Sequence, residues 1–275
     1  MAKIKSLLIY VVFPIGLLML AINKLYIIMG IAIVLYFSIF VLFQYENILK
    51  IFTGYHSKRD NLDKAIVYAF KAYKLKNSTV HTALMFIYLL LKAAKYDKAG
   101  EIIGETEPRK MTDQEKYSLS INKALFLWKK NRITESLELY EKLLDEGEST
   151  VLYGSYGYVI TLGDDLSKAL ELNEKAYKYN GSNKAILDNL GLTYIKLNRL
   201  DEAFDIYEEL MKKDPQFPEA YYNMADLMQR MKDTDSAVRY MKKCVQLKFD
   251  GLSTLTPEQA QKKLDQLMRL QGSLQ

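Results

Sequence analysis

Apolar side chains in residues 184–217 return every three or four positions over two consecutive segments. This spacing indicates two amphipathic helices. Asn198 and Arg199 separate the segments and leave room only for a tight turn, so the two helices should be antiparallel. The apolar positions are Leu187, Leu190, Gly191, Tyr194 and Leu197 in the first segment, and Leu200, Ala203, Phe204, Tyr207, Leu210 and Met211 in the second.

A small residue marks the same place in each such pair and returns about every 34 positions. The successive separations are 34, 37, 33, 34 and 34 residues, and the six residues are Ala65, Ala99, Ser136, Ala169, Ala203 and Ala237. A period of this length is typical of stacked helical repeats, in which each pair buries an apolar face against the next. The alternative is a helical bundle in which the period arises by chance. We therefore expect an all-α chain built as an α-solenoid.

Residues 184–217 resemble the tetratricopeptide repeat (TPR) family, whose pattern includes a Leu-Gly pair, a tyrosine, an alanine, a second aromatic residue and a proline. The residues that match this pattern and should pack the repeats are Leu190, Gly191, Tyr194, Ala203, Tyr207 and Pro215, with Ala237 in the next copy. In the copy before, Asn173 replaces the aromatic residue. The resemblance implies about five repeats over residues 80–251, with an imperfect leading repeat over 46–79.

A last helix is predicted in residues 252–275. Thr256 and Gln259 have the spacing of a capping box, and Pro257 fits the first helical position. The helix should run from about 257 to 271 and present a polar outer face, which the end of a repeat array needs. Its apolar stripe should consist of Ala260, Leu264, Leu267 and Met268.

Residues 1–45 have a different pattern, because 6–22 and 25–43 are continuous apolar runs separated by Asn23 and Lys24. At ~1.5 Å per residue, the runs would be roughly 26 and 28 Å long as helices, close to the ~30 Å of a bilayer core. One unbroken helix would be too long to span once. We expect a transmembrane hairpin that turns at Asn23-Lys24. The alternatives are a cleaved signal peptide for the first run and buried core helices for both.

Basic residues flank the expected spans on the side of both chain ends, and only Lys24 lies in the turn. The positive-inside rule therefore predicts a multi-pass protein of the plasma or inner membrane, with the repeat domain in the cytoplasm. An apolar stripe over residues 48–55 suggests that the second span continues as the first helix of the leading repeat. Lys58, Arg59 and Lys64 are candidates for contact with anionic lipid head groups, or they belong to a solvated helix face.

Candidate chemistry is sparse. His56 and His81 belong to no metal-binding motif, and Cys244 occupies an inward-facing repeat position. The sequence has no glycine-rich phosphate-binding loop. The net charge is +5, and its basic residues alternate with acidic ones, which argues against a nucleic-acid surface. We therefore expect no enzyme activity, no catalytic residues, no metal, no cofactor and no nucleic-acid partner.

The resemblance implies a binding surface, because in this family the first helix of each repeat lines a concave groove that holds peptides. A polar residue precedes the Leu-Gly place in four of the repeats, and an amide there can both donate to and accept from a peptide backbone. The alternative is that these asparagines join neighbouring helices. The candidate groove residues are Asn122, Ser155, Asn189 and Asn223, with Trp128, Tyr158 and Tyr222 as aromatic contacts.

The function expected from the sequence is a membrane-anchored adaptor or scaffold. It would present a TPR groove to a protein or peptide partner at the cytoplasmic membrane face, and residues 6–43 would contact the bilayer. The alternative is a regulatory or assembly subunit of a membrane enzyme or export complex, with the transmembrane hairpin as its main contact.

Overall fold

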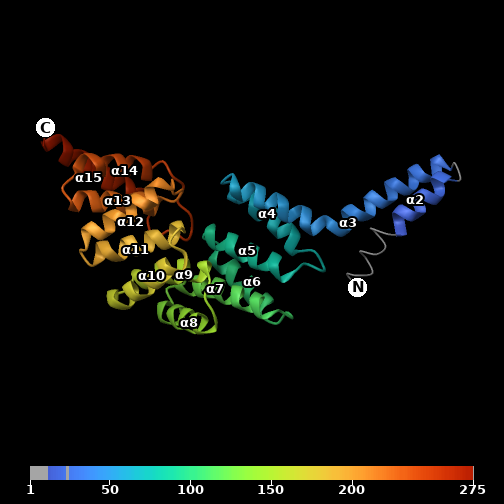
Figure 1. Cartoon of the computed structure of the whole chain (residues 1–275), viewed down its shortest axis with the longest axis horizontal. Helices are drawn as coiled ribbons and strands as arrows, with labels where there is room; N and C mark the ends of the chain where they lie inside the picture. Colours follow the sequence, from blue (N-terminus) through green and yellow to red (C-terminus); the bar gives the residue numbers. More distant parts are fainter. Residues whose placement is uncertain (1–11, 23–24, 275) are drawn as a thin grey trace. The chain divides into compact units, whose positions relative to one another are not determined.

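The computed structural model describes residues 12–22 and 25–274, and all regular secondary structure in these residues is helical (Figure 1). The part of the first expected span before residue 12 and the expected turn at Asn23-Lys24 lie outside the described residues. The chain forms two compact units, Met1–Phe86 and Ile87–Gln275, and the boundary falls inside α5 (Val80–Lys92).

The first unit contains α2 (Phe13–Ile22), α3 (Tyr26–Lys58) and α4 (Leu62–Tyr73). Helix α2 packs against α3, and the rings of Phe13 and Tyr36 stack with their centroids 3.9 Å apart. Of the described helices, only α3 is both long and apolar enough to cross a membrane. Within the described residues, helix α2 has ten residues, fewer than this measure requires. The described residues thus contain one candidate span, and the predicted two-helix hairpin remains a prediction.

Helix α3 continues without a break past its apolar part and packs along α4. A carboxylate fixes this extension to the start of α5. Glu46 accepts hydrogen bonds from the backbone N–H of Thr79 at 3.0 Å, from the Thr79 hydroxyl at 2.7 Å and from the Thr82 hydroxyl. Partial burial acts to raise the pKa of Glu46, but the hydrogen bonds from Thr82 and Thr79 outweigh it and lower the pKa. A negative charge here is favourable because a helix N-terminus has unpaired N–H groups.

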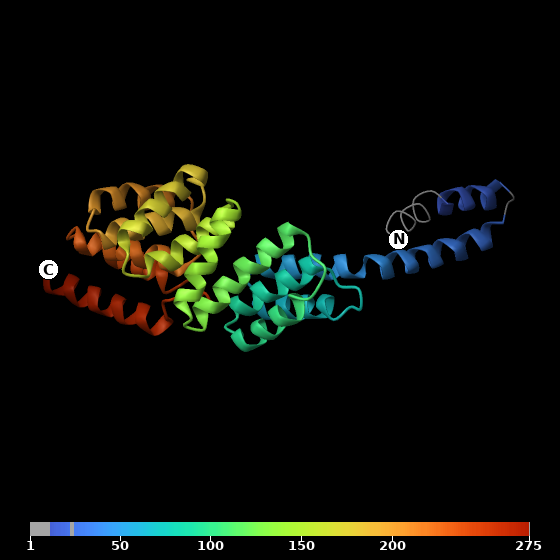
Figure 2. The same cartoon turned by 90° about the horizontal axis from the view of Figure 1, so that it is seen from below.

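The second unit is a TPR-like solenoid in which successive helices pair and each pair packs on the next (Figures 1 and 2). Its helices after α5 are α6 (Tyr96–Thr106), α7 (Asp113–Lys129), α8 (Ile133–Glu146), α9 (Thr150–Thr161), α10 (Leu166–Asn180), α11 (Lys184–Lys196), α12 (Leu200–Lys212), α13 (Pro218–Arg230), α14 (Thr234–Cys244) and α15 (Pro257–Leu274). The separation of 37 between Ala99 and Ser136 has a simple cause: α7 has 17 residues, whereas α11 has 13, so α7 is longer by about one turn.

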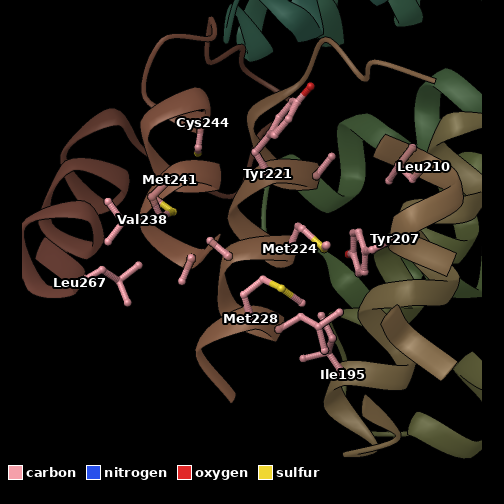
Figure 3. Packing of buried hydrophobic residues seen from close by; sticks show 14 of the residues in the cluster. Ile195, Tyr207, Leu210, Tyr221, Met224, Met228, Val238, Met241, Cys244 and Leu267 are labelled. Atoms are coloured by element: carbon pink, nitrogen blue, oxygen red, sulfur yellow. The ribbon is translucent and has the colours of Figure 1, made fainter. Parts of the chain in front are cut away.

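The small residues that mark the period lie buried between helices. All six, from Ala65 to Ala237, have no exposed surface. Gly191 has the same role, because a Cβ atom there would lie 2.6 Å from the ring of Tyr207, which is itself fully buried. Figure 3 shows Tyr207 and Leu210 facing the methionines of α13 across this part of the core. Helices can approach this closely only where one of them has no large side chain.

The final helix begins as the sequence predicts. Gln259 accepts a hydrogen bond from the backbone N–H of Thr256 at 2.8 Å, and Thr256 Oγ1 accepts one from the N–H of Gln259 at 3.2 Å. Helix α15 packs on α14 and buries an apolar stripe. The buried residues of the stripe are Ala260, Leu264 and Leu267.

One residue of the predicted apolar stripe, Met268, is not buried, because its side chain is 47% exposed. Helix α15 packs chiefly against the single helix α14, so it has less surface to cover than a helix inside the array.

Candidate functional site

The inner face of the second unit contains a hollow of about 500 Å³. Helices α9, α11 and α13 contribute one wall, and α15 and the loop before it contribute the other. Among the lining residues are Tyr158, Leu192, Lys196, Tyr222, Asn223 and Lys262. Three of these, Tyr158, Tyr222 and Asn223, are candidates from the sequence, so the structure brings part of the expected set to one place.

Trp128 lies next to this hollow. Its ring meets Tyr158 edge-on with centroids 5.5 Å apart, and the ammonium of Lys129 lies 4.6 Å from the Trp128 ring centroid. Both aromatic residues are half-buried. The pair therefore extends the aromatic surface of the inner face from α9 to α7.

The other polar candidates lie between helices. Asn189 is 2% exposed, and its Nδ2 donates to the carbonyl of Gly154 in α9 at 2.9 Å. Asn223 Nδ2 donates to Asp188 Oδ1 in α11 at 3.2 Å. Each bond joins residues 35 positions apart, so it links the first helix of one repeat to that of the previous repeat. For Asn189 and Asn223, the structure shows the helix-joining contacts that the sequence left as an alternative.

The remaining two candidates are also inside the array. Asn122 is 8% exposed. Ser155 is half-buried and lies beside the buried hydroxyl of Tyr140. The expected asparagine row therefore does not form a continuous exposed ladder, and Asn223 is the member of the row that lines the hollow.

A buried carboxylate lies between α11 and α13, which the sequence did not reveal. Asp188 is 3% exposed and accepts a hydrogen bond from the hydroxyl of Tyr207 at 2.9 Å. Burial raises the pKa of Asp188 to about 7, although the hydrogen bonds from Tyr207 and Asn223 act in the opposite direction. The three side chains form one polar network that connects two repeats.

A second buried network explains the asparagine that departs from the repeat pattern. Asn173 has no exposed surface, and its Nδ2 donates to Thr161 Oγ1 at 2.8 Å and to Thr193 Oγ1 at 3.0 Å. A buried amide requires such partners. The two threonines lie on α9 and α11, so only the folded array shows why an aromatic residue is replaced here.

The loop between α14 and α15 is the least expected part of the site, because its middle lies along the inner face of its own array. Residues 250–254, which we call the strap, contact α5, the start of α6 and the end of α7. The strap also reaches the wall of the hollow, since the hydroxyls of Thr254 and Tyr158 are 2.6 Å apart. The sequence analysis assigned no role to this stretch, which falls where the predicted repeats end and the C-terminal segment begins.

Two further kinds of chemistry were considered, a metal site and a reactive cysteine. Among the described residues, no group of three or more His, Cys, Asp or Glu side chains could hold a metal ion. Cys244 has no exposed surface, its Sγ donates to the carbonyl of Pro218 at 3.3 Å, and burial raises its pKa to about 12. The site therefore offers shape, hydrogen bonds and charge for binding.

These features define a helical-repeat protein with a hollow on its inner face. Family models described as TPR repeat and tetratricopeptide repeat match residues 191–232 and 218–250. The chain therefore carries tetratricopeptide repeats.

Relatives by sequence share only a small part of their length with this chain. The probable UDP-N-acetylglucosamine–peptide N-acetylglucosaminyltransferase SEC of Arabidopsis thaliana is 36% identical over 78 residues, which are 28% of this chain and 8% of that protein. The BBSome complex member BBS4 of Bos taurus is 31% identical over 86 residues, which are 31% of this chain and 17% of that protein. The chain thus spans less than a fifth of either relative.

Solved structures show the same fold at low sequence identity. A chain of the APC/C hetero-tetramer Cut9-Hcn1 matches 80% of this chain and 42% of its own length, with a TM-score of 0.67 and 11% identity. The type IV pilus biogenesis factor PilW matches 73% of this chain and 92% of its own, with a TM-score of 0.56 and 14% identity. Pseudomonas aeruginosa pilF matches 82% of this chain and 96% of its own length, with a TM-score of 0.55 and 14% identity. These similarities establish a TPR-like α-solenoid.

Proposed function

We propose that this protein is an interaction scaffold that binds a protein or peptide partner on the inner face of its repeats and is held at a membrane by its N-terminal helices. The observation that supports binding is the hollow of about 500 Å³ where aromatic, amide and lysine side chains meet. Stacked helix pairs build extended binding surfaces, and the TPR fold is typical of proteins that bind other proteins without catalysis.

The groups around the hollow suit an extended peptide. Tyr158 and Tyr222 combine apolar rings with hydroxyl groups, and half-buried aromatic residues of this kind are enriched where proteins meet. Lys196 and Lys262 place positive charge at the same surface. Of the sequence candidates, we propose Trp128, Tyr158, Tyr222 and Asn223 as partner contacts, with Asn122, Ser155 and Asn189 as their support within the array.

Membrane attachment is proposed from the surface of α3. Its apolar side chains are unusually exposed: Ile27 is 81%, Val34 65% and Leu42 75% exposed. An exposed apolar surface of this extent marks a site of contact with lipid or with another protein. We propose that α2 and α3 belong to a transmembrane hairpin within residues 1–45, that the protein is multi-pass, and that its repeat domain lies in the cytoplasm.

Aromatic and basic side chains follow the apolar part of α3, as expected near a bilayer interface. His56 stacks on Tyr68 with ring centroids 5.3 Å apart, and the guanidinium of Arg59 lies 4.6 Å from the centroid of Tyr55. We propose that Lys58, Arg59 and Lys64 contact anionic lipid head groups, because basic residues close to a charged surface each contribute about 1 kcal/mol of binding energy.

The experiment that tests the scaffold function is site-specific photocrosslinking in native membranes. A photoreactive amino acid replaces Tyr222 in the hollow or Tyr179, an exposed tyrosine on α10 that serves as the matched control. We expect a discrete adduct with a partner protein from position 222 and no such adduct from position 179. Identical adducts from both positions, or none from position 222, would refute partner binding on the inner face.

The exposed apolar surface of α3 also favours a second candidate, a regulatory or assembly subunit that contacts a membrane enzyme or export complex through its spans. The same crosslinker at Val34 separates the two functions. Protein adducts from Val34 together with none from Tyr222 would favour the second candidate.

A further inference from the structure

The loop that contains the strap has twelve residues, 245–256, between the end of α14 and the start of α15. Loops of this length without secondary structure are uncommon in compact domains and are usually functional. Here the loop is only partly exposed, and its partners come from helices far away in sequence: Lys92, which accepts from the N–H of Gly251, lies 159 positions before it.

The first half of the strap contacts the array through an ion pair and through hydrogen bonds of its backbone. The carboxylate of Asp250 lies 3.1 Å from Lys92 Nζ. The N–H of Gly251 donates to the carbonyl of Lys92 at 2.6 Å, and the hydroxyl of Tyr96 donates to the carbonyl of Gly251 at 2.5 Å. The carbonyl of Lys92 is at the end of α5, where helix carbonyls have no partner within the helix. The strap therefore pairs with the array as a bound peptide would.

Position 251 requires glycine because the backbone of the strap lies against the backbone at the end of α5. A Cβ atom there would lie 2.4 Å from the backbone nitrogen of Ala94 and 2.4 Å from the carbonyl oxygen of Leu91. Both are main-chain atoms, so neither can move aside by changing a rotamer. The subsite formed by these residues accepts only a residue without a side chain.

The second half of the strap binds the array through the carbonyl of Ser253 and through the hydroxyl groups of Ser253 and Thr254. Lys129 Nζ donates to the carbonyl of Ser253 at 3.1 Å, and the Ser253 hydroxyl donates to the carboxylate of Glu219. The hydroxyl of Thr254 shares a hydrogen bond with that of Tyr158. Lysine, carboxylate and tyrosine groups from three helices thus meet consecutive residues of one segment.

We propose that the strap is an intrachain ligand, and that the partner of this inner face is an extended peptide that displaces it. The partner segment would have an acidic residue, then glycine, then any residue, then two hydroxyl residues, like Asp250 to Thr254. This inference rests on the proposed scaffold function and adds the chemistry of the partner. A tethered segment competes at a high effective concentration, so only a partner that binds better than the strap would occupy the site.

The test uses a fluorescent peptide with the sequence of residues 248–256, added to the full-length protein in lipid nanodiscs and followed by fluorescence anisotropy. Gly251→Val should expel the strap, and Gly272→Val is the matched control because a Cβ at 272 meets no atom within 4 Å. We expect the Gly251→Val protein to bind the peptide at least tenfold more tightly than the wild type or the Gly272→Val protein. Equal affinity in all three proteins would overturn the proposal.

A charge exchange tests the chemistry of the site. In the Gly251→Val background, Lys92→Glu should weaken binding of this peptide about tenfold and restore it for a peptide with lysine in place of the aspartate. If neither peptide responds to Lys92→Glu, the strap contacts do not describe a binding site and the proposal fails.

If Gly251→Val does not fold, as judged by circular dichroism, Asp250→Ala with Ser253→Ala replaces it, because this pair removes side-chain contacts without adding atoms. We expect the same increase in peptide affinity, and no increase would again overturn the proposal. Failure here is distinguishable from failure of the scaffold function, since crosslinks from Tyr222 report partner binding independently of the peptide.

Discussion

Gly191 shows how one residue sets the distance between two helices. The ring of Tyr207 occupies the space where a side chain at 191 would be, whereas a Cβ at Gly154 would meet only the Cβ of Ala185 at an ordinary 3.6 Å. Both glycines lie inside helices, at α11 and α9. They therefore differ in packing while sharing the same unfavourable helix propensity.

This difference predicts opposite effects of alanine at the two positions. Gly191→Ala should lower the free energy of unfolding by about 1–3 kcal/mol through overpacking. Gly154→Ala should leave it unchanged or raise it by up to about 1 kcal/mol, because alanine favours the helix. Urea unfolding followed by circular dichroism measures both, and equal effects would show that Tyr207 does not restrict position 191.

The carboxyl group of Asp188 predicts a pH dependence of stability. Its pKa is about 7 in the folded protein, above the value of about 3.9 in an unfolded chain. The stabilisation from its protonated form is fully present below about pH 4 and is lost as the pH rises through about 7.

The free energy of unfolding of the wild type should decrease between pH 5 and pH 8. Asp188→Asn should remove about 1–3 kcal/mol of this decrease, because the buried amide does not become charged. Asp205→Asn, at an exposed position on α12, is the control and should keep the wild-type profile. The measurement is the urea midpoint at both pH values. A profile for Asp188→Asn that matches the wild type would contradict the assignment.

At the scale of elements, the turns inside the helix pairs share one backbone conformation. Five of the six pairs, counting α3 with α4, turn through a residue with positive φ, and none of the five is glycine. The residues are Asp60, Ala94, Asn131, Asn198 and Lys232. The sequence indicated a tight turn at Asn198, and asparagine tolerates this conformation. Lysine and alanine do not favour it, so Lys232 and Ala94 adopt it because the helices on both sides are fixed by packing.

This strain predicts a stabilising substitution. Lys232→Gly should raise the free energy of unfolding by about 0.5–1 kcal/mol, because glycine adopts the φ of 66° without steric cost. The matched change Lys212→Gly, in the last turn of α12, should lower it by up to about 1 kcal/mol. Thermal unfolding of both variants checks the prediction, and a lower melting temperature for Lys232→Gly would show that the turn is not strained.

At the scale of the whole molecule, the proposed membrane topology predicts which face of the membrane the repeats occupy. Ser182 is exposed in the turn after α10, and Cys244 is buried. With Cys244→Ala as the background, Ser182→Cys should react with an impermeant thiol reagent in inside-out vesicles but not in intact cells. The Cys244→Ala protein alone is the control and should remain unlabelled. Labelling in intact cells would place the repeats outside.

The extent to which the sequence predicts this protein differs between its parts. The period of 34 residues identified the helix pairs, and the capping box at Thr256 identified the start of α15, because both are set by interactions between nearby residues. Of the expected row, Asn189 is buried because its side chain donates to the neighbouring repeat, whereas Asn223 lines the hollow. Asn173 and Asp188 likewise depend on partners from other helices.

The sequence alone determined that the chain repeats a pair of amphipathic helices and that an apolar segment precedes them, since periodicity and composition are local properties. Only the tertiary structure decided which polar residues are buried and that residues 250–254 occupy the inner face. The reason is physical: the partners of the strap lie as many as 159 positions away, from Lys92 to Gly251, and no local pattern specifies a contact between backbones that meet only after the helices have packed.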